Sequence, residues 1–127
     1  MGQGEGTILA TDTPLSLWGG LNPETGEIID RHHPLNGSHV SGRVLVMPSG
    51  RGSSTASGVL LNAIIAGKAP AAILLSRDDE IIALGAIVAE ELGLRKIPVI
   101  VLGAEDYAAA TKATYAIVRP DGNVELA

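Results

Sequence analysis

The apolar residues in the middle of the chain follow two different periods. Residues 43–47 form a nearly continuous apolar run that Pro48 ends, and residues 71–75 form a second such run. Runs of this kind are typical of strands covered on both faces. Between them, apolar residues over 57–66 recur at helical spacing, and Gly67 stands where a helix would end. The pattern predicts a strand, loop, helix and strand unit with a right-handed parallel crossover, whose first strand is central in the sheet.

The same alternation continues toward the C-terminus. Asp78 and Asp79 precede a helical pattern of apolar residues and stand where an N-cap is expected. The sequence predicts, in this order, a helix over residues 81–92, a strand over 98–102, a helix over 104–112 and two small strands over 115–119 and 123–126. A Pro-Asp-Gly turn signal separates the two small strands. Together these elements indicate an α/β fold.

The N-terminal third has a different character, since it is rich in glycine, proline, threonine and aspartate. Short apolar pieces at residues 7–10, 15–18 and 27–29 predict extra short strands joined by turns. Residues 22–26, Asn-Pro-Glu-Thr-Gly, predict a hairpin turn, because proline fixes φ at the second turn position and glycine can close the turn with positive φ.

The composition narrows the choice of partners. The chain has 127 residues, of which 46% are hydrophobic, so we expect residues 1–127 to form one domain around a single core. A formal charge of -5 disfavours a large contact with nucleic acid or anionic lipid. The apolar runs are far shorter than the roughly 20 residues that span a bilayer, and the start lacks the pattern of a signal peptide. We therefore expect a cytoplasmic protein without a membrane or nucleic-acid partner.

Cysteine is absent from the sequence. A disulfide, a thiolate-bound zinc ion and an iron–sulfur cluster held by this chain's own sulfurs are therefore excluded. Any iron–sulfur cluster that works with this chain must be carried by another one.

The segment best suited to chemistry is residues 47–58, between the first central strand and the following helix. In open α/β sheets, ligands bind at the carboxyl ends of the strands. The glycines of this segment permit close backbone approach, and its hydroxyl groups can hold an anion together with the N–H groups of the helix start. Arg51 adds a charged fork suited to a carboxylate or a phosphate. The residues concerned are Gly50, Arg51, Gly52, Ser53, Ser54, Thr55 and Gly58.

This segment has a plainer interpretation as well. It matches neither a phosphate-binding loop with a Gly-Lys-Ser ending nor a dinucleotide-binding fingerprint. A tight turn followed by a helix with serine caps would use the same residue types.

Several segments, taken in order, resemble the aconitase X swivel domain, the small subunit of one branch of the aconitase superfamily. The resemblance covers about residues 4–103 and is carried by residues 14–20 (PLSLWGG), 22–26 (NPETG), the His33-Pro34 turn, residues 42–54 (GRVLVMPSGRGSS) and residues 67–73 (GKAPAAI). Together these motifs are specific, although each alone would be weak. The resemblance implies a single swivelling β/β/α domain that docks against a large subunit carrying an iron–sulfur cluster.

The resemblance also implies an activity and a set of site residues. Members of the family are hydro-lyases, and in the wider superfamily a serine of the swivel domain takes a proton from carbon. Matched onto this chain, that serine is Ser53, with Arg51, Gly52 and Ser54 as substrate-binding residues. A serine hydroxyl can act as a base only if strong donors hold its alkoxide. In aconitases proper an arginine follows the two serines, whereas here Thr55 follows them and Arg51 precedes them, so this sequence matches the family pattern at Ser53 and departs from it at Arg51.

Two hydroxy-acid substrates are known for this branch by resemblance. Bacterial members dehydrate cis-3-hydroxy-L-proline, and archaeal two-subunit members dehydrate (R)-5-phosphomevalonate in the mevalonate pathway. Residues 51–58 and 83–91 look closer to the bacterial members, while a free-standing small chain fits the archaeal ones equally. The alternative function is a non-catalytic domain of the same fold that binds a small anion or another subunit. An exposed apolar face around the Ser53 segment would favour the catalytic subunit.

The remaining distinctive side chains are interpreted as structural. His32, His33 and His39 are expected in a surface loop, because two adjacent histidines in a turn do not readily face one ion, and no metal site is predicted on this chain. Trp18 is expected to cap the edge of the core, with a contact to substrate or partner as the alternative.

Overall fold

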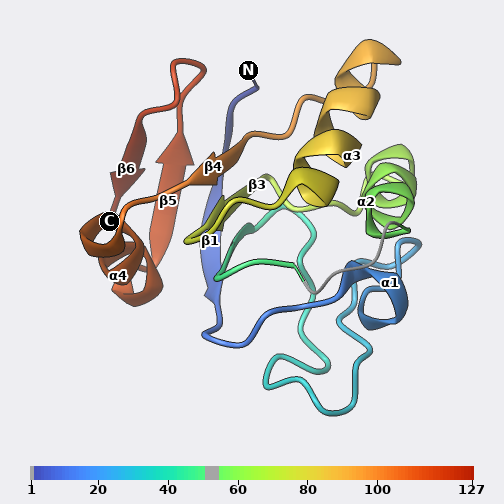
Figure 1. The fold of residues 1–127 in the computed structure, drawn as a ribbon, viewed down its shortest axis with the longest axis horizontal. Coiled ribbons are helices and arrows are strands. Elements are labelled where there is room, and N and C mark those ends of the chain that lie inside the picture. The colour runs from blue at the N-terminus through green and yellow to red at the C-terminus, as the bar shows by residue number, and fades with distance from the viewer. Residues whose placement is uncertain (1, 51–54) are drawn as a thin grey trace.

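The strands form one mixed sheet. The structure is a computed structural model that describes residues 2–50 and 55–127. The strands are β1 (Gly4–Ala10), β2 (Val44–Met47), β3 (Ala72–Leu75), β4 (Val99–Val101), β5 (Tyr115–Val118) and β6 (Val124–Leu126). They lie in the order β4-β3-β2-β1-β5-β6, so β2 is central, as predicted (Figure 1). The pairs among β1, β2, β3 and β4 are parallel, whereas β5 pairs antiparallel with β1 and β6 pairs antiparallel with β5.

Three helices cover the two faces of this sheet. α2 (Ala56–Ile65) and α3 (Glu80–Glu91) lie on one face, and α4 (Ala104–Lys112) lies on the other (Figure 1). The connections β2-α2-β3 and β3-α3-β4 advance across the sheet in the same direction, so crossovers of one hand place both helices on the same side. The chain then returns from β4 to β5 at the far side of β1, and α4 therefore lies on the opposite face.

The central strand β2 explains why both faces need a cover. Its side chains alternate between two apolar clusters. Leu45 and Met47 pack with residues of α2 and α3, while Val44 and Val46 pack with residues of α4 and β5. All four are fully buried, which confirms the prediction of a strand covered on both faces.

The helices of the crossover units agree with the sequence patterns to within a residue or two. Gly67 follows α2 with a φ of +73°, the left-handed conformation that glycine adopts readily at a helix end. Asp79 is the N-cap of α3, because its side chain accepts hydrogen bonds from the backbone N–H groups of Ile81 and Ile82. α4 begins and ends at the predicted residues.

The N-terminal third departs from its prediction. The strand expected over residues 15–18 is reduced to one parallel bridge between Leu15 and Gly50, followed by the short helical turn α1 (Leu17–Gly20). The expected turn at residues 22–26 is present, and it is closed by a single antiparallel bridge between Leu21 and Ile28. Apolar pieces of three or four residues, interrupted by glycine and proline, offer too few consecutive ladder pairs for a longer strand.

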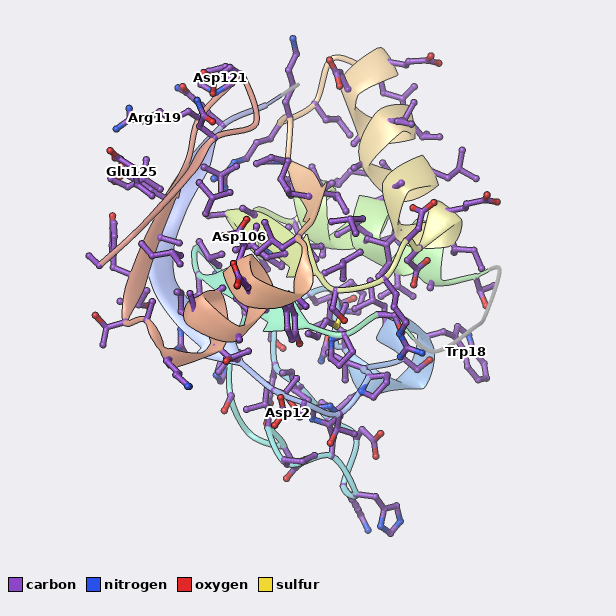
Figure 2. The ribbon with its side chains drawn as sticks, turned by 60° about the vertical axis from the view of Figure 1, so that its left-hand side comes forward. Asp12, Trp18, Asp106, Arg119, Asp121 and Glu125 are labelled. Atoms are coloured by element: carbon purple, nitrogen blue, oxygen red, sulfur yellow. The ribbon has the colours of Figure 1, made fainter. Side chains whose placement is uncertain are left out.

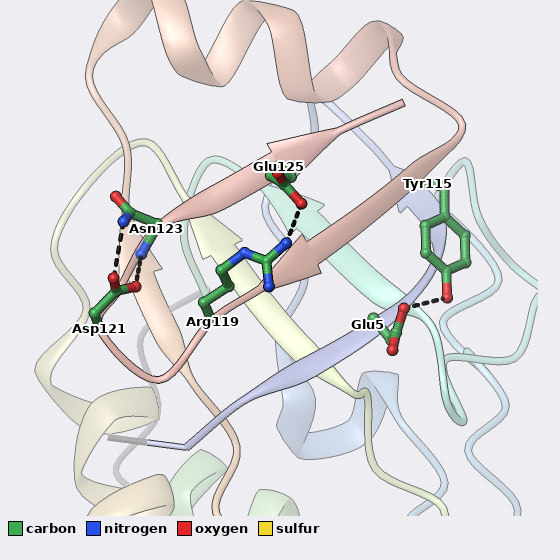
Figure 3. Close-up of polar contacts among 6 residues, drawn as sticks. All are labelled: Glu5, Tyr115, Arg119, Asp121, Asn123 and Glu125. Atoms are coloured by element: carbon green, nitrogen blue, oxygen red, sulfur yellow. Dashed lines mark hydrogen bonds and ion pairs between the residues drawn. The ribbon is translucent and has the colours of Figure 1, made fainter.

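The hairpin of β5 and β6 carries polar contacts on its solvent side (Figure 3). Arg119 forms an ion pair with Glu125 across the hairpin, and Asn123 donates to the carboxylate of Asp121 in the turn. The hydroxyl of Tyr115 donates to the carboxylate of Glu5 on the adjacent strand β1, at 2.9 Å. The Tyr115–Glu5 bond joins β5 to β1, whereas the other contacts lie within the hairpin.

Among the helices that the structure describes, none is both long and apolar enough to cross a bilayer.

Candidate functional site

Three parallel strands place their carboxyl ends side by side at one edge of the sheet. β1 leads into Thr11 and Asp12, β2 leads into residues 48–50, and β3 leads into Ser76 and Arg77. The backbone N–H of Thr11 donates to the carbonyl of Val46 at 2.9 Å, which continues the pairing of β1 with β2 beyond the end of β1. We call this region the carboxyl edge. In Figure 2, Asp12 and Trp18 lie toward this end of the molecule, far from the hairpin turn that holds Asp121.

The four site residues predicted from the sequence are Arg51, Gly52, Ser53 and Ser54, and they lie outside the described residues. Their two flanks are described. Gly50 precedes them and follows the end of β2, and Thr55 follows them as the N-cap residue of α2. The predicted segment therefore connects the carboxyl end of the central strand to a helix start, as the sequence indicated.

The flank before the segment is held by hydrogen bonds from the two residues that directly follow β3. The carbonyl of Pro48 accepts hydrogen bonds from the N–H groups of Ser76 and Arg77, at 3.1 and 3.0 Å. The hydroxyl of Ser76 donates to the same carbonyl at 3.3 Å. Three donors on one carbonyl fix the point where the chain leaves the sheet.

Asp79 ties this flank to a helix. Its Oδ2 accepts a hydrogen bond from the backbone N–H of Gly50 at 2.8 Å, and its Oδ1 accepts from Ile81 and Ile82, each at 3.1 Å. The sequence predicted the cap and missed the bond to Gly50, which spans 29 positions. Gly50 also has no room for a side chain, because a Cβ atom would lie 2.6 Å from Oδ2 of Asp79 and 2.8 Å from Cδ1 of Ile82.

Arg77 is a cation at the carboxyl edge that sequence reasoning missed. Its Nη2 donates to the hydroxyl of Ser49 at 3.2 Å, and that hydroxyl donates to the carbonyl of Gly50 at 2.9 Å. The guanidinium is exposed and offers five N–H donors in a fixed fork. The sequence could have indicated Arg77 by its place directly after the second buried strand. The carboxyl ends of neighbouring parallel strands lie at the same edge of a sheet, so residues that follow β2 and β3 come together there.

Tyr107 reaches the same edge from the opposite face of the sheet. Its hydroxyl donates to the carbonyl of Thr11 at 3.4 Å. Partial burial raises the pKa of Tyr107, the negative charge of Asp12 raises this pKa further, and the positive charge of Arg77 lowers it. Asp12 and Arg77 are therefore both near enough to Tyr107 for their charges to act on its pKa.

The histidine-proline turn lies beside the end of β1, where His33 is buried rather than at the surface as predicted. Its Nδ1 accepts a hydrogen bond from the N–H of Leu35 at 3.1 Å, and its Nε2 lies 3.0 Å from the carbonyl oxygen of Thr13. These contacts satisfy both ring nitrogens, so burial of the ring leaves neither nitrogen without a hydrogen bond. His32 and His39 are exposed, as expected. No group of three or more histidine, aspartate or glutamate side chains suited to a metal ion occurs among the described residues.

A cavity of about 380 Å³ opens between this turn and the end of β1. Its lining consists of residues 10–13, Pro34, Leu35 and Thr111. The carboxyl edge is therefore hollowed next to the threonine and aspartate that follow β1.

Trp18 is exposed, and the prediction that it caps the core is wrong. The side chain is 59% exposed, while the preceding Leu17 is only 2% exposed. Trp18 has extended backbone angles and Gly19 has a φ of +76°, so the chain turns outward after Leu17. Leu17 takes the buried position, and the indole of Trp18 points to solvent (Figure 2).

Comparison with known proteins gives consistent similarities. A family model described as "Aconitase X swivel domain" matches residues 1–126. The chain is 58% identical over 102 residues to the cis-3-hydroxy-L-proline dehydratase of Pseudomonas aeruginosa, a match that covers 80% of this chain and 18% of that protein. It is 44% identical over 88 residues to the phosphomevalonate dehydratase small subunit of Methanothermobacter thermautotrophicus, which covers 69% of this chain and 67% of that one. The chain thus spans about a fifth of the length of the first curated relatives it matches.

A solved structure shares the fold over nearly the full chain. The crystal structure of Thermococcus kodakaraensis aconitase X in its holo-form matches with a TM-score of 0.83 at 32% identity, over 99% of this chain and 91% of that one.

Proposed function

Because the chain belongs to the aconitase X swivel domain family, we propose that it is the small, serine-bearing component of an aconitase X type hydro-lyase. It works together with a large subunit and is inactive alone. One observation carries the proposal: the segment that holds Ser53 connects the carboxyl end of the central strand to the start of α2. Ligands of open α/β sheets bind at this position.

In this proposal Ser53 is the base. Dehydration of a hydroxy acid breaks a C–H bond next to a carboxylate and a C–O bond on the neighbouring carbon, and it forms a C=C bond and water. Ser53 takes the proton from carbon as an alkoxide, the electron pair of the C–H bond forms the C=C bond, and the hydroxyl leaves as hydroxide on the side of the partner. Return of the proton from Ser53 to this hydroxide completes the water and restores the alkoxide. An alkoxide is held at neutral pH only by preorganised donors in a site that excludes water. Gly52, Ser54 and Arg51 are proposed to hold the substrate around it.

The described residues support Arg77 as a second cation that binds the substrate, beside Arg51. Arg77 lies at the carboxyl edge and already contacts the flank of the segment through Ser49. A planar guanidinium binds a carboxylate through two parallel hydrogen bonds. We therefore add Arg77 to Arg51 as a group that binds the substrate's acid function.

The iron–sulfur cluster that the family implies does not fit the residues of this chain. Such clusters are held by cysteine thiolates, with histidine in a minority of cases. The sequence contains no cysteine, and of its three histidines His32 and His39 are exposed while both ring nitrogens of His33 are engaged by Thr13 and Leu35. The cluster is therefore assigned to the large subunit, and the contribution of this chain is the base and the substrate contacts.

Of the two substrates, cis-3-hydroxy-L-proline is favoured. The higher identity to the Pseudomonas aeruginosa dehydratase, 58% against 44% for the archaeal small subunit, supports this choice. (R)-5-phosphomevalonate is the alternative substrate. A non-catalytic domain that binds a small anion or another subunit is the alternative function.

The test is reconstitution. The chain is produced with the large aconitase X subunit under anaerobic conditions, and dehydration of both substrates is measured for wild type and for Ser53→Ala. Ser54→Ala is the comparison variant, because it removes a substrate-binding hydroxyl next to the base and is expected to raise KM without abolishing turnover. We expect turnover of one substrate that Ser53→Ala abolishes without preventing assembly. Full activity of Ser53→Ala would remove Ser53 as the base, and a wild-type complex that turns over neither substrate would favour the binding domain.

A further inference from the structure

We propose that Asp79 is a positioning residue for the Ser53 segment, acting through its hydrogen bond to Gly50. This inference rests on the proposed function, and it assigns a role to a side chain that is four positions beyond β3 and belongs to a different connection of the sheet. Asp79 does not touch the substrate in this proposal. It fixes the flank from which the catalytic segment begins.

The first argument is that the two carboxylate oxygens of Asp79 accept hydrogen bonds from different segments. Oδ1 accepts from the N–H groups of Ile81 and Ile82 and caps α3, which a helix start requires of its N-cap residue. Oδ2 is not needed for that cap. It accepts the N–H of Gly50 at 2.8 Å, a length expected for a bond to a charged acceptor.

A second argument comes from the packing of Gly50. A Cβ atom at this position would meet Oδ2 of Asp79 at 2.6 Å and Cδ1 of Ile82 at 2.8 Å. The backbone of the flank is therefore seated directly against the first turn of α3. On its other side, Gly50 forms a parallel bridge with Leu15. The residue before the catalytic segment is thus held between two elements.

The third argument is that α3, against which Gly50 lies, is itself held firmly by α2. α2 and α3 pack against each other, and Ile82 is fully buried in the core between them. Gly85 of α3 lies against the backbone of Ser57 in α2, where a Cβ atom would be 2.9 Å from the Ser57 carbonyl oxygen. α3 therefore contacts the chain on both sides of residues 51–54, at Gly50 through Asp79 and at Ser57 through Gly85.

This arrangement matters for catalysis because a base must be placed to within a fraction of an ångström. A misplacement of about 1 Å can cost about 100-fold in rate. Loss of the Asp79 anchor frees Gly50 and relaxes the start of the segment, while the fold around it keeps its core. The expected signature is a loss of kcat in a protein that remains folded and assembled.

Asp79→Asn separates the anchor from the cap. Asparagine is as good an N-cap as aspartate, but its side chain has only one acceptor oxygen and cannot serve Gly50 and the helix start together. Asp79→Ser is the second variant, because serine also caps helices and is too short to reach Gly50 as well. Asp78→Asn is the matched control, since it removes the adjacent exposed carboxylate. Gly50→Ala disrupts the same contact by placing a Cβ atom against Oδ2 of Asp79.

The experiment combines two readouts on the full chain. The first is the hydrogen-exchange rate of the Gly50 amide, measured by NMR without partner or substrate. The second is dehydratase turnover of the complex with the large subunit. For Asp79→Asn and Asp79→Ser we expect faster exchange at Gly50, an unchanged thermal midpoint within a few degrees, and a fall in kcat of about 10- to 100-fold with a smaller change in KM. Asp78→Asn should keep wild-type values in both readouts.

The outcomes distinguish this inference from the proposed function. A wild-type complex without turnover overturns the proposed function, and the role of Asp79 in that reaction falls with it. Turnover by wild type together with kcat within twofold of wild type in both Asp79 variants overturns the inference alone. Equal loss of kcat in Asp79→Asn and Asp78→Asn overturns it as well, because the effect would then follow charge and not the contact with Gly50.

Discussion

Nε2 of His33 lies 3.0 Å from the carbonyl oxygen of Thr13, and the ring joins the histidine-proline turn to the end of β1. The second ring nitrogen, Nδ1, accepts the N–H of Leu35, so the neutral ring carries its proton on Nε2 and donates it to Thr13. The turn and the strand end that line the cavity at the carboxyl edge are thereby held together by one side chain.

The His33 contact predicts a stability effect. His33→Ala leaves the partly buried carbonyl of Thr13 and the partly buried N–H of Leu35 without the ring that bonds them, which costs about 2 kcal/mol of unfolding free energy. His32→Ala removes an exposed ring from the adjacent position and should change that free energy by less than about 0.5 kcal/mol. Urea unfolding of the two variants beside wild type measures both values. Equal stability of the two variants would show that the His33 contacts contribute nothing.

Charges around Tyr107 predict a titration pattern. In a Tyr115→Phe background Tyr107 is the sole tyrosine, and its tyrosinate absorbance reports its pKa. Asp12→Asn should lower the pKa of Tyr107, and Arg77→Ala should raise it, because these side chains respectively raise and lower it in the wild type. An Arg77→Ala variant with an unchanged Tyr107 pKa would place the guanidinium away from the phenol.

The raised pKa of Tyr107 also fixes a direction for alkaline stability. The pKa in the folded protein exceeds the unfolded value of about 10, so the fold favours the neutral phenol. The associated stability is present below pH 10 and is lost as the pH rises through the folded pKa. Thermal midpoints measured from pH 9 upward should fall less steeply in Tyr107→Phe than in wild type.

Trp18 predicts a contrast between neighbouring residues. Trp18→Ala should change the unfolding free energy by less than about 0.5 kcal/mol, because the indole is 59% exposed. Leu17→Ala should cost about 3 kcal/mol, because Leu17 is 2% exposed and leaves a cavity. Denaturant midpoints of the two variants measure the difference. A large loss in Trp18→Ala would mean that the indole is packed against the core.

Arg77 predicts a kinetic effect in the reconstituted complex. Arg77→Gln should raise KM for the hydroxy-acid substrate by about tenfold or more, the loss expected for a charged hydrogen bond. Arg95→Gln removes an exposed arginine from the connection that leads into β4, away from the carboxyl edge, and should leave KM unchanged. Steady-state kinetics on both variants decides whether Arg77 contacts the substrate, since equal KM values would exclude it.

The local elements of this fold were readable in the sequence because they depend on neighbours along the chain. The alternation of Val44 to Met47 requires only that successive strand side chains face opposite sides. Asp79 and Gly67 mark the ends of helices through bonds and angles within one turn. The loop that carries Ser53 follows from these elements, since it is the connection between the central strand and the next helix.

The predictions for two side chains were wrong because their burial depends on contacts that the local pattern does not show. His33 was expected at the surface, as its type and its turn suggest, and it is buried because Thr13 and Leu35 satisfy its ring. Trp18 was expected to cap the edge of the core, and it is exposed because Leu17 occupies the buried position.

By itself, the sequence determined the parallel strand and helix units, the position of the Ser53 segment between β2 and α2, and the absence of cysteine ligands. Tertiary structure alone decided that β5 pairs with β1, that Arg77 reaches Ser49, and that the second oxygen of Asp79 holds Gly50. Periodicity and capping are set by residues within a few positions of one another, and they leave a pattern in the chain. Contacts across about 30 or more positions are set by which elements pack together, and no local pattern encodes them.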